Sequence, residues 1–523
     1  MIKAELLWVD DEIDLLKPYI LFLEEKGYVM QCVNNGRDAI ELCRSKRFDI
    51  VFLDEQMPGL SGLETLTELH ISYPEMPVVM VTKSEDEGIM NRAIGRKITD
   101  YLIKPVNPSQ VLMSIKKILE QEERLVEVVT QEYRELFNPL ISEIENCRTA
   151  DDWISVYKKL VSWELKLDRT QHQMREMLAM QKEEANRLFS RFIKGNYERW
   201  IIEGRNHVDG DRPVMSTDLF ERFVFPFVDK GEKLFFILID NFRFDQWQVV
   251  KDIVDEFFNY REEIYFSILP TATPYARNAI FSGLMPKQLS ELFPDYWVEE
   301  SEEEGKNLNE ELFIKSHLER NKRNYRISYH KINRNQEGEK LVSRFQELGK
   351  YDLNVLVFNF IDFLSHARTE SAMIRELAAD ESAYRSLTRS WFKHSPLPAL
   401  LEKIAGKGYK LVLTTDHGSI RVRNGVKVVG DRETGVNLRY KLGKNLGYNP
   451  KDLFDIIHPE NAGLPAPNMT TRYIFALKDD FFVYPNNSHH YQSYYGDTFQ
   501  HGGVSMEEMM VPVVVLKPRA KTL

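Results

Sequence analysis

The feature that most constrains this fold is a repeating pattern of continuous apolar runs and amphipathic stretches, broken once near the middle of the chain. The pattern fills residues 1–120 and returns from about 206 to the end, whereas 121–205 contain one Pro and two Gly. Alternating strand-like and helix-like segments predict a parallel sheet with helices on both faces. Between them, Glu, Lys, Leu and Met at helical spacing predict a helical bundle. We therefore expect α/β domains at 1–120 and 206–523, joined by a helical-bundle linker at 121–205.

Composition excludes several classes of protein. Of the 523 residues, 43% are hydrophobic and the formal net charge is -11, so the chain can fill sizeable cores and does not present a generally nucleic-acid-coating surface. The three cysteines, Cys32, Cys43 and Cys147, have neither disulfide-framework nor zinc-site spacing, which predicts a cytoplasmic protein. No apolar run reaches about 18 residues, so we expect no membrane insertion. Because the cysteines lack zinc-site spacing, any metal site must use His and carboxylate ligands.

Carboxylates stand at the ends of the first two strong strand candidates. Asp10 and Asp11 follow one apolar run and Asp54 follows another, and the carboxyl ends of neighbouring parallel strands form the crevice where ligands bind. Three carboxylates in one crevice repel each other unless a cation neutralises them, and hard oxygen ligands suit Mg²⁺. Thr82 and Lys104 end two further strands and supply a hydroxyl and an ammonium. This set predicts a site that forms an aspartyl phosphate.

Residues 1–120 resemble the receiver domain of two-component response regulators along their whole length. The matching motifs are "VDDE" at the first strand end, "LDEQMPGLSG" around Asp54 and "KP" at 104–105. The resemblance implies a doubly wound, flavodoxin-like fold and phosphorylation of Asp54 by a cognate sensor histidine kinase. The alternative is an ordinary doubly wound sheet whose strands end in acids.

The same resemblance assigns roles to individual residues. It implies that Asp11 and Asp54 bind Mg²⁺ directly, with Asp10 acting mainly through water. It implies Thr82 and Tyr101 as switch residues, together with Lys104. Receivers of this kind pair through the face near the last two of these residues, so we expect a homodimer when the domain is phosphorylated.

Potential metal ligands follow several apolar runs in the C-terminal region. They are, in chain order, Asp240, Asp362, His366, Asp416, His417 and His501. His366 lies four residues after Asp362, which places both on one helix face if a helical turn follows that strand. If the sheet is parallel, the ends of these runs converge on one edge. Asp and imidazole together suit Zn²⁺ or Mn²⁺. Each residue alone is more simply structural, whereas the set predicts a metal centre.

A candidate nucleophile lies in the same region. Thr271, in "ILPTATPYARNAI", follows a strand-like run, with Thr273 predicted as the N-cap of a helix and Pro274 at its first position. Phosphate oxygens are favoured at such a helix start, where unpaired N–H groups face the ligand. A threonine hydroxyl is a poor nucleophile at neutral pH and needs a base or a metal. Because no Ser-His-Asp arrangement is readable, we predict Thr271 as a metal-activated nucleophile.

The ordered series Asp, Thr, Asp-x-x-x-His, Asp-His-Gly and His-Gly-Gly, over roughly 235–515, resembles the alkaline phosphatase superfamily. The terminal "HGGVSMEEMMVPVVVL" resembles its PglZ branch in particular. The resemblance implies a large α/β, alkaline-phosphatase-like domain with two Zn²⁺ ions. The ligand sets that it implies are Asp362, His366 and His501 for one metal, and Asp240, Asp416, His417 and Thr271 Oγ for the other.

The whole chain is similar to the PorX-type response regulators, a family associated with type IX secretion. The resemblance implies a metal-dependent phosphodiesterase, and Thr rather than Ser as nucleophile is typical of the phosphodiesterase branches of the superfamily. We expect a nucleotide phosphodiester substrate, cyclic or linear, and control by phosphorylation of Asp54 and dimerisation. The alternative is a non-catalytic regulator whose zinc-bound domain binds a sigma factor, another transcription partner or a secretion-machinery protein.

Two basic stretches are open to more than one interpretation. Residues 421–444 carry many Arg and Lys just after the Asp-His pair, which would suit substrate phosphates. Residues 322–334 interleave basic and aromatic side chains, which would suit stacking on bases. A solvated basic surface explains both stretches at least as well.

Overall fold

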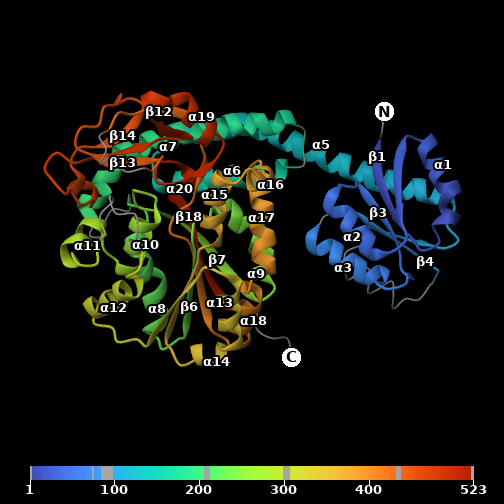
Figure 1. Cartoon of the computed structure of the whole chain (residues 1–523), viewed down its shortest axis with the longest axis horizontal. Coiled ribbons are helices and arrows are strands. Elements are labelled where there is room, and N and C mark those ends of the chain that lie inside the picture. Colours follow the sequence, from blue (N-terminus) through green and yellow to red (C-terminus); the bar gives the residue numbers. More distant parts are fainter. Residues whose placement is uncertain are drawn as a thin grey trace. The chain divides into compact units, whose positions relative to one another are not determined.

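A computed structural model describes residues 3–73, 76–83, 98–168, 170, 172–204, 212–298, 307–430 and 437–519. The chain divides into two compact units, Met1–Glu132 and Tyr133–Leu523, each of which contains a central sheet and surrounding helices (Figure 1). The α/β class expected for both ends of the chain is confirmed.

The first unit is built on a five-stranded parallel sheet in the order β2-β1-β3-β4-β5. Its strands are β1 (Ala4–Val9), β2 (Tyr28–Val33), β3 (Ile50–Asp54), β4 (Val78–Thr82) and β5 (Asp100–Ile103). Its described helices are η1 (Ile13–Leu16), α1 (Lys17–Glu25), α2 (Gly36–Ser45), α3 (Gly62–Ser72) and the first part of α5 (Pro108–Asn146). Helices α1 and α5 pack on Leu6 and Trp8, and α2 and α3 pack on Leu7 and Val9 of the opposite face. This is the doubly wound arrangement that the sequence predicts.

Three long helices connect the two sheets along the chain: α5, α6 (Ala150–Leu167) and α7 (His172–Glu203). Helix α5 begins at Pro108, and the Asn107 side chain accepts a hydrogen bond from the Gln110 N–H. It continues through Pro139 to Asn146, into the region for which a helical bundle was predicted. Helix α6 begins with a capping box, in which Thr149 and Asp152 satisfy each other's backbone N–H groups.

The second unit is organised by a six-stranded sheet in the order β7-β18-β10-β6-β9-β8. Its strands are β6 (Leu234–Ile239), β7 (Phe258–Phe266), β8 (Ile327–Ile332), β9 (Leu353–Phe358), β10 (Lys410–Thr414) and β18 (Met510–Pro518). Strands β6, β8, β9 and β10 are parallel, whereas β18 runs antiparallel to both of its neighbours. The amino end of β18 therefore lies at the carboxyl ends of the parallel strands, and a residue that precedes β18 reaches the same edge.

Helices cover both faces of this sheet (Figure 1). On one face, under α8, α10 and α12, the rings of Phe220, Phe236 and Phe281 are in mutual contact. Helices α9 and α18 contact strands from the other face. The helices of this unit are η3 (Ser216–Asp218), η4 (Phe220–Val224), α8 (Phe225–Val228), α9 (Phe244–Asp255), α10 (Thr273–Ser282), α11 (Pro286–Leu292), α12 (Glu310–Arg320), α13 (Asn335–Ser343), α14 (Phe345–Leu348), α15 (Phe360–Glu370), α16 (Ala372–Leu377), α17 (Glu381–His394), α18 (Leu397–Gly406), η5 (Pro459–Ala462), η6 (Pro485–Asn487), α19 (Ser488–Tyr495) and α20 (Met506–Met509).

Three small sheets lie outside the main one. They pair β11 (Ile420–Arg421) with β17 (Phe499–Gln500), β12 (Asn424–Lys427) with β16 (Asp480–Val483), and β15 (Arg472–Ala476) with β13 (Tyr440–Gly443) and β14 (Leu453–Ile456). Among the helices that the structure describes, none has the length and apolar character needed to cross a bilayer.

Candidate functional site

Six of the predicted metal ligands form two groups at the carboxyl edge of the main sheet. Within each group, one ligand atom from each residue lies within 4.8 Å of the others. The rings of His417 and His501, one from each group, stack with their centroids 4.3 Å apart, so the groups are adjacent. The groups are Asp240, Asp416 and His417, and Asp362, His366 and His501.

The second group is assembled by one helical turn and a loop. Asp362 and His366 lie four residues apart on α15, and Asp362 Oδ2 is 3.4 Å from His366 Nε2. His501 arrives from the segment before β18, and its Nε2 is 3.6 Å from Asp362 Oδ1. The His366 side chain is 59% exposed, whereas Asp362 and His501 are largely covered. This group therefore opens to solvent at His366.

The orientation of two imidazoles fits metal ligation. Nδ1 of His417 lies 3.1 Å from the Gly418 carbonyl, and Nδ1 of His501 lies 3.3 Å from the Thr271 carbonyl. Because a carbonyl only accepts hydrogen bonds, each Nδ1 must carry the proton, which leaves the Nε2 lone pair facing the carboxylates. Burial and the neighbouring His417 lower the pKa of His501 to about 3, so its ring is neutral. A neutral imidazole held through its other nitrogen is the form that binds a metal.

The charge balance of the first group also favours a cation. Arg277 forms ion pairs with both Asp240 and Asp416, and its Nε lies 2.9 Å from Asp416 Oδ2. Burial nevertheless raises the pKa of Asp240 well above its usual value. The pKa of Asp416 is lowered, because Arg277 and His417 together outweigh the effect of burial. One guanidinium serves several buried carboxylates, Glu310 included, so a divalent cation fits this group.

The structure places Thr273, rather than Thr271, beside the first group. Helix α10 begins at Thr273 and its N-cap is Ala272, whose backbone is extended, so the prediction of Thr273 as N-cap is wrong. As the first helical residue, Thr273 directs its hydroxyl to within 3.1 Å of His417 Nε2 and 3.4 Å of Asp240 Oδ1.

Thr271 has different neighbours. Its hydroxyl donates to the Gly503 carbonyl at 2.9 Å and accepts from the Gly502 N–H at 3.1 Å. Its carbonyl accepts the hydrogen bond from His501 described above. Thr271 therefore fixes the loop and ring orientation of His501, and its Oγ is not brought to the donor atoms of Asp240 and His417.

Arg277 and Asn241 also belong to the metal centre, although neither was predicted there. The Asn241 backbone N–H donates to Asp416 Oδ1, and its side chain donates to Asp362 Oδ1 at 3.2 Å, so it contacts both groups. Asn241 has a left-handed backbone with φ 58°, which lets its main chain and side chain face the two groups at once. In the sequence, Asn241 could have been found because it directly follows Asp240. Arg277 could have been found because it lies one helical turn after Thr273.

The first unit gathers Asp10, Asp11 and Asp54 at the carboxyl ends of β1 and β3, with ligand oxygens within 4.8 Å of one another. Lys104 Nζ lies 2.8 Å from Asp10 Oδ2 and 3.2 Å from Asp54 Oδ2. Burial raises the pKa of Asp54, although Lys104 opposes the shift. Asp54 Oδ1 is buried and has no hydrogen-bond partner among the residues that the structure describes. A buried free oxygen beside two further acids fits Mg²⁺.

The predicted switch residues lie on the next two strands. Thr82 is buried at the end of β4, and Tyr101 is half-buried on β5, where it pairs with Met80. The Lys104–Pro105 peptide bond that follows β5 is cis. The three predicted switch residues therefore lie at the end of β4, within β5 and in the loop after β5.

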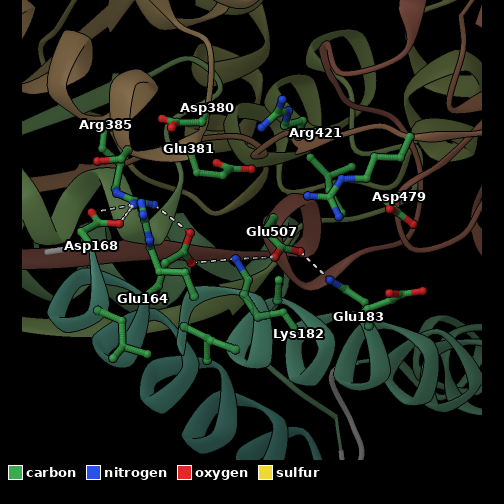
Figure 2. Close-up of a pocket in the computed structure, with 18 of the residues that line it drawn as sticks. Glu164, Asp168, Lys182, Glu183, Asp380, Glu381, Arg385, Arg421, Asp479 and Glu507 are labelled. Carbon is green, nitrogen blue, oxygen red and sulfur yellow. Dashed lines mark hydrogen bonds and ion pairs between the residues drawn. The ribbon is translucent and has the colours of Figure 1, made fainter. Parts of the chain in front are cut away.

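Linker helix α7 contacts the loop that carries His501. The Asn186 side chain accepts a hydrogen bond from the Met506 N–H at 2.8 Å and donates one to Glu507 at 2.9 Å. Lys182 lies between Glu507, at 3.3 Å, and Glu164 of α6, at 2.7 Å (Figure 2). The linker thus holds the start of this loop's short helix α20.

A second set of ion pairs joins α6 to α17. Arg385 is 3% exposed and pairs with Glu164, Asp168 and Asp245, the first two at 2.8 Å (Figure 2). A pocket of about 220 Å³ lies along this network. Three acids of the ion-pair network, Glu164, Asp245 and Glu381, are close enough to one another to hold a cation. Their charges are already neutralised by Arg243, Arg385 and Lys182. We therefore assign these residues to docking of the linker.

Aromatic and hydrogen-bond contacts extend the same interface. The rings of Phe189 and Trp200 on α7 pack on Phe266 of β7, and the Tyr197 hydroxyl accepts the Leu269 N–H at 2.8 Å. Leu269 lies two residues before Thr271. The composition of 121–205 predicted helices but gave no signal for these contacts.

The basic stretch 322–334 contains the edge strand β8, which the sequence analysis missed as a strand. Arg323 pairs with Asp229, and Arg326 pairs with Asp352 at 2.9 Å. These contacts favour a structural role over base stacking for most of the stretch.

Two arginines of the basic stretch 421–444 form ion pairs. Arg421 pairs with Asp497, and the fully buried Arg439 pairs with Glu508. Residues 431–436 lie outside the described part of the chain.

Three family models match the chain in order. The response regulator receiver domain matches residues 6–116, the PorX response regulator linker domain matches 124–201, and the BREX system PglZ alkaline phosphatase-like domain matches 219–516. The last of these covers more than half of the chain. The chain belongs to the PglZ family as a PorX-type response regulator. Its receiver, linker and PglZ matches follow the order of the two sheets and the helices between them.

Curated relatives of this PorX-type regulator match a smaller part of it. The alginate biosynthesis transcriptional regulatory protein AlgB of Pseudomonas syringae pv. tomato is 34% identical over 118 residues, which are 23% of this chain and 26% of the relative. The transcriptional regulatory protein ResD of Bacillus subtilis is 27% identical over 119 residues, 23% of this chain and 49% of the relative. The chain thus spans between a quarter and a half of the length of these relatives.

Among solved structures, a CheY-like response regulator receiver domain from Methanospirillum hungatei JF-1 is 28% identical. The match covers 24% of this chain and 99% of that structure, with a TM-score of 0.23.

The family has direct consequences for function. The protein is a two-component response regulator with a receiver domain and a PglZ domain. A receiver domain implies a cognate sensor kinase and is compatible with dimerisation. Receivers use Mg²⁺ and alkaline phosphatase-like domains typically use metals, and the PglZ domain indicates a hydrolase of the phosphatase superfamily.

Proposed function

We propose that the PglZ domain is a two-metal phosphodiesterase with Thr273, in place of Thr271, as its nucleophile. The observation that carries this proposal is the position of the Thr273 hydroxyl, 3.1 Å from His417 Nε2 and 3.4 Å from Asp240 Oδ1 at the start of α10. A phosphate against this hydroxyl would meet the unpaired N–H groups and the positive dipole end of α10. Thr271, which braces the His501 loop, acts as a positioning residue.

The chain's residues divide the remaining work. Zn²⁺ or Mn²⁺ ions, bound by the two groups, would supply Lewis acidity for the charge on the attacking and leaving oxygens. Thr273 Oγ forms a bond to phosphorus as the bond to the leaving alkoxide breaks, and water then releases the phosphate monoester from Thr273. Arg277 holds Asp240 and Asp416 in place, and the carbonyls of Gly418 and Thr271 fix the imidazole rings.

The proposed substrate is a nucleotide phosphodiester, and the proposed control is phosphorylation of Asp54 followed by dimerisation. A diester is supported by the threonine nucleophile, which fits the diesterase branches of the superfamily. The primary test is a screen of zinc- and manganese-loaded wild-type protein against nucleotide diesters. If no diester is hydrolysed, the non-catalytic alternative, a regulator of transcription or type IX secretion that binds its partner through this domain, replaces the proposal.

The metal content of the protein gives a separate prediction. Wild-type protein is expected to hold two Zn²⁺ per PglZ domain by elemental analysis. His366→Ala removes an exposed ligand with little effect on packing, so we expect this variant to retain about one Zn²⁺ after dialysis against a weak chelator. His489→Ala, which removes an exposed histidine from α19 outside both groups, is the matched control and should retain two. Equal metal content in wild type and His366→Ala would contradict the ligand assignment.

Control by the receiver gives another prediction. Phosphorylation of wild-type protein with a small-molecule phosphodonor in the presence of Mg²⁺ is expected to tighten dimerisation by about tenfold or more, a typical coupling between two sites. Asp54→Asn removes the acceptor and should sediment as the unphosphorylated protein under all conditions. Identical sedimentation of phosphorylated and unphosphorylated wild type would contradict this mode of control.

A further inference from the structure

A pocket of about 420 Å³ lies at the carboxyl ends of β8 and β9, on the sheet edge that also carries the metal groups. Its volume falls within the range of about 300–1,000 Å³ that is usual for small-molecule sites. We call it the Phe360 pocket. The residues that line it are Ile332, Asn333, Arg334, Asn335, Gln336, Phe358, Phe360 and Trp391.

Stacked aromatic rings form one wall of the Phe360 pocket. The ring of Phe360 lies parallel to that of Trp391, with an interplanar angle of 3° and centroids 4.9 Å apart. Phe358 meets Trp391 edge to face and supports it from the strand. Trp391 is buried, whereas Phe360 is 37% exposed. The stack therefore offers a rigid flat ring to an incoming planar group, and such a platform gains affinity without ordering a flexible side chain.

Polar groups complete the lining. Asn333, Asn335 and Gln336 are exposed and carry amides, each of which offers both donors and an acceptor. The exposed Arg334 guanidinium forms no ion pair with any residue that the structure describes. A purely apolar partner would leave these groups unsatisfied, whereas the edge of a heteroaromatic base would satisfy them. The lining therefore suits a planar, hydrogen-bonding ring with an anion nearby.

The Phe360 pocket is linked to the metal centre through one buried side chain. Asn359 donates a hydrogen bond to Asn333 Oδ1 at 2.7 Å, and its own Oδ1 accepts one from Arg277 at 3.3 Å. Arg277 in turn holds the carboxylates of the first metal group. Phe360 directly follows Asn359 at the start of α15, so the aromatic wall adjoins the side chain that bonds to Arg277. Asn359 and Arg277 therefore connect the Phe360 pocket to the first metal group.

We infer that the Phe360 pocket binds the base of a nucleotide diester whose phosphorus lies at Thr273. The base stacks on the exposed face of Phe360, its edge meets the amides of Asn333 and Gln336, and Arg334 meets a second phosphate. This inference rests on the proposed function, because it supplies a recognition site for the substrate of that reaction. It assigns base recognition to α15 and the β8–α13 loop, on the side of the metal groups away from β18.

The test compares two diesters that share a leaving group. Thymidine 5′-(p-nitrophenyl phosphate) carries a base, and methyl p-nitrophenyl phosphate does not. We expect Phe360→Ala to raise KM for the thymidine ester about tenfold, with little change in kcat, and to leave hydrolysis of the methyl ester unchanged. Gln336→Ala, on the exposed first turn of α13, should raise the same KM about fivefold without touching the rings. Phe363→Ala is the matched control.

The control variant removes the same residue type from the same helix, since Phe363 is 48% exposed on α15 and does not line the pocket. An equal rise of KM in Phe363→Ala, or equal effects of Phe360→Ala on both diesters, would overturn the assignment. So would unchanged kinetics of Phe360→Ala and Gln336→Ala on the thymidine ester.

A binding measurement separates this inference from the proposed function. Titration calorimetry with adenosine 5′-monophosphate and ribose 5-phosphate should show about tenfold tighter binding of the former to wild type, and no such preference in Phe360→Ala. If this preference appears while no diester is hydrolysed, the base site stands and the proposed reaction fails. If the diesters are hydrolysed but the two phosphates bind equally, the base site is overturned and the proposed reaction stands.

Discussion

Thr273→Val is expected to lower the rate of phosphodiester hydrolysis by about 10³-fold or more, because loss of a covalent nucleophile removes nearly all of the chemical step. The assay is steady-state hydrolysis of bis(p-nitrophenyl) phosphate by zinc-loaded protein. Elemental analysis of the variant shows whether its metals are retained, which separates loss of a nucleophile from loss of the site. Thr273→Ser keeps a hydroxyl at the same helix start and should recover a substantial part of the activity.

Thr271→Val is the matched control for this prediction. It removes the hydrogen bonds to Gly502 and Gly503, which should lower stability by about 1–2 kcal/mol and slow hydrolysis by about tenfold or less. The His501 ring would still be oriented, because the Thr271 carbonyl is unchanged. If the two variants exchange these behaviours, Thr271 is the nucleophile and the assignment of Thr273 fails.

Arg385→Met is expected to lower the free energy of unfolding of the second unit by about 3–5 kcal/mol, because it leaves buried carboxylates without their cation. Arg385 is almost fully buried between Glu164, Asp168 and Asp245, so solvent does little to replace it. Urea unfolding followed by tryptophan fluorescence measures the effect. Six of the seven tryptophans lie in the second unit, so this signal reports mainly on it.

The control for Arg385→Met is Arg389→Met, one turn further along α17. Arg389 pairs with Asp252, whose side chain is 63% exposed, and an ion pair of this kind contributes about 0–1 kcal/mol. The double variant Glu164→Gln with Arg385→Met should also cost less than the sum of the single changes, because each removes the partner of the other. Equal losses in Arg385→Met and Arg389→Met would show that the network at α6 is not a stabilising contact.

Much of the fold could be read from local patterns. The alternation in 1–120 predicted the doubly wound sheet, and the acids at strand ends predicted the group of Asp10, Asp11 and Asp54. In the second unit, every predicted ligand except His501 lies at or just after the end of an apolar run, and a parallel sheet brings such positions to one edge. The reversed direction of β18 was not predicted, but it does not disturb this outcome, because His501 precedes that strand.

Other features depend on tertiary contacts that the sequence does not encode locally. From the motif "PTATP" alone, Thr271 and Thr273 are equally plausible nucleophiles. Only the start of α10 at Thr273 decides which hydroxyl faces His417. Strand β8 was missed because charged residues interrupt its apolar pattern at the edge of the sheet. Strand β15 shows the same limit, because its apolar run resembles those of the main sheet although it belongs to a small separate sheet. The contacts of Arg277 link residues more than thirty positions apart, beyond the reach of any motif.

The contacts of α7 bear on how this chain can be taken apart. A fragment that starts near 206 would lack Asn186 and Tyr197, and with them the supports of the His501 loop and of the segment before Thr271. The smallest sensible enzyme fragment therefore starts at 133, with the linker helices included. For chimaera design, the interchangeable part is the receiver, joined in helical phase within α5, while linker and hydrolase have to be transplanted as one piece.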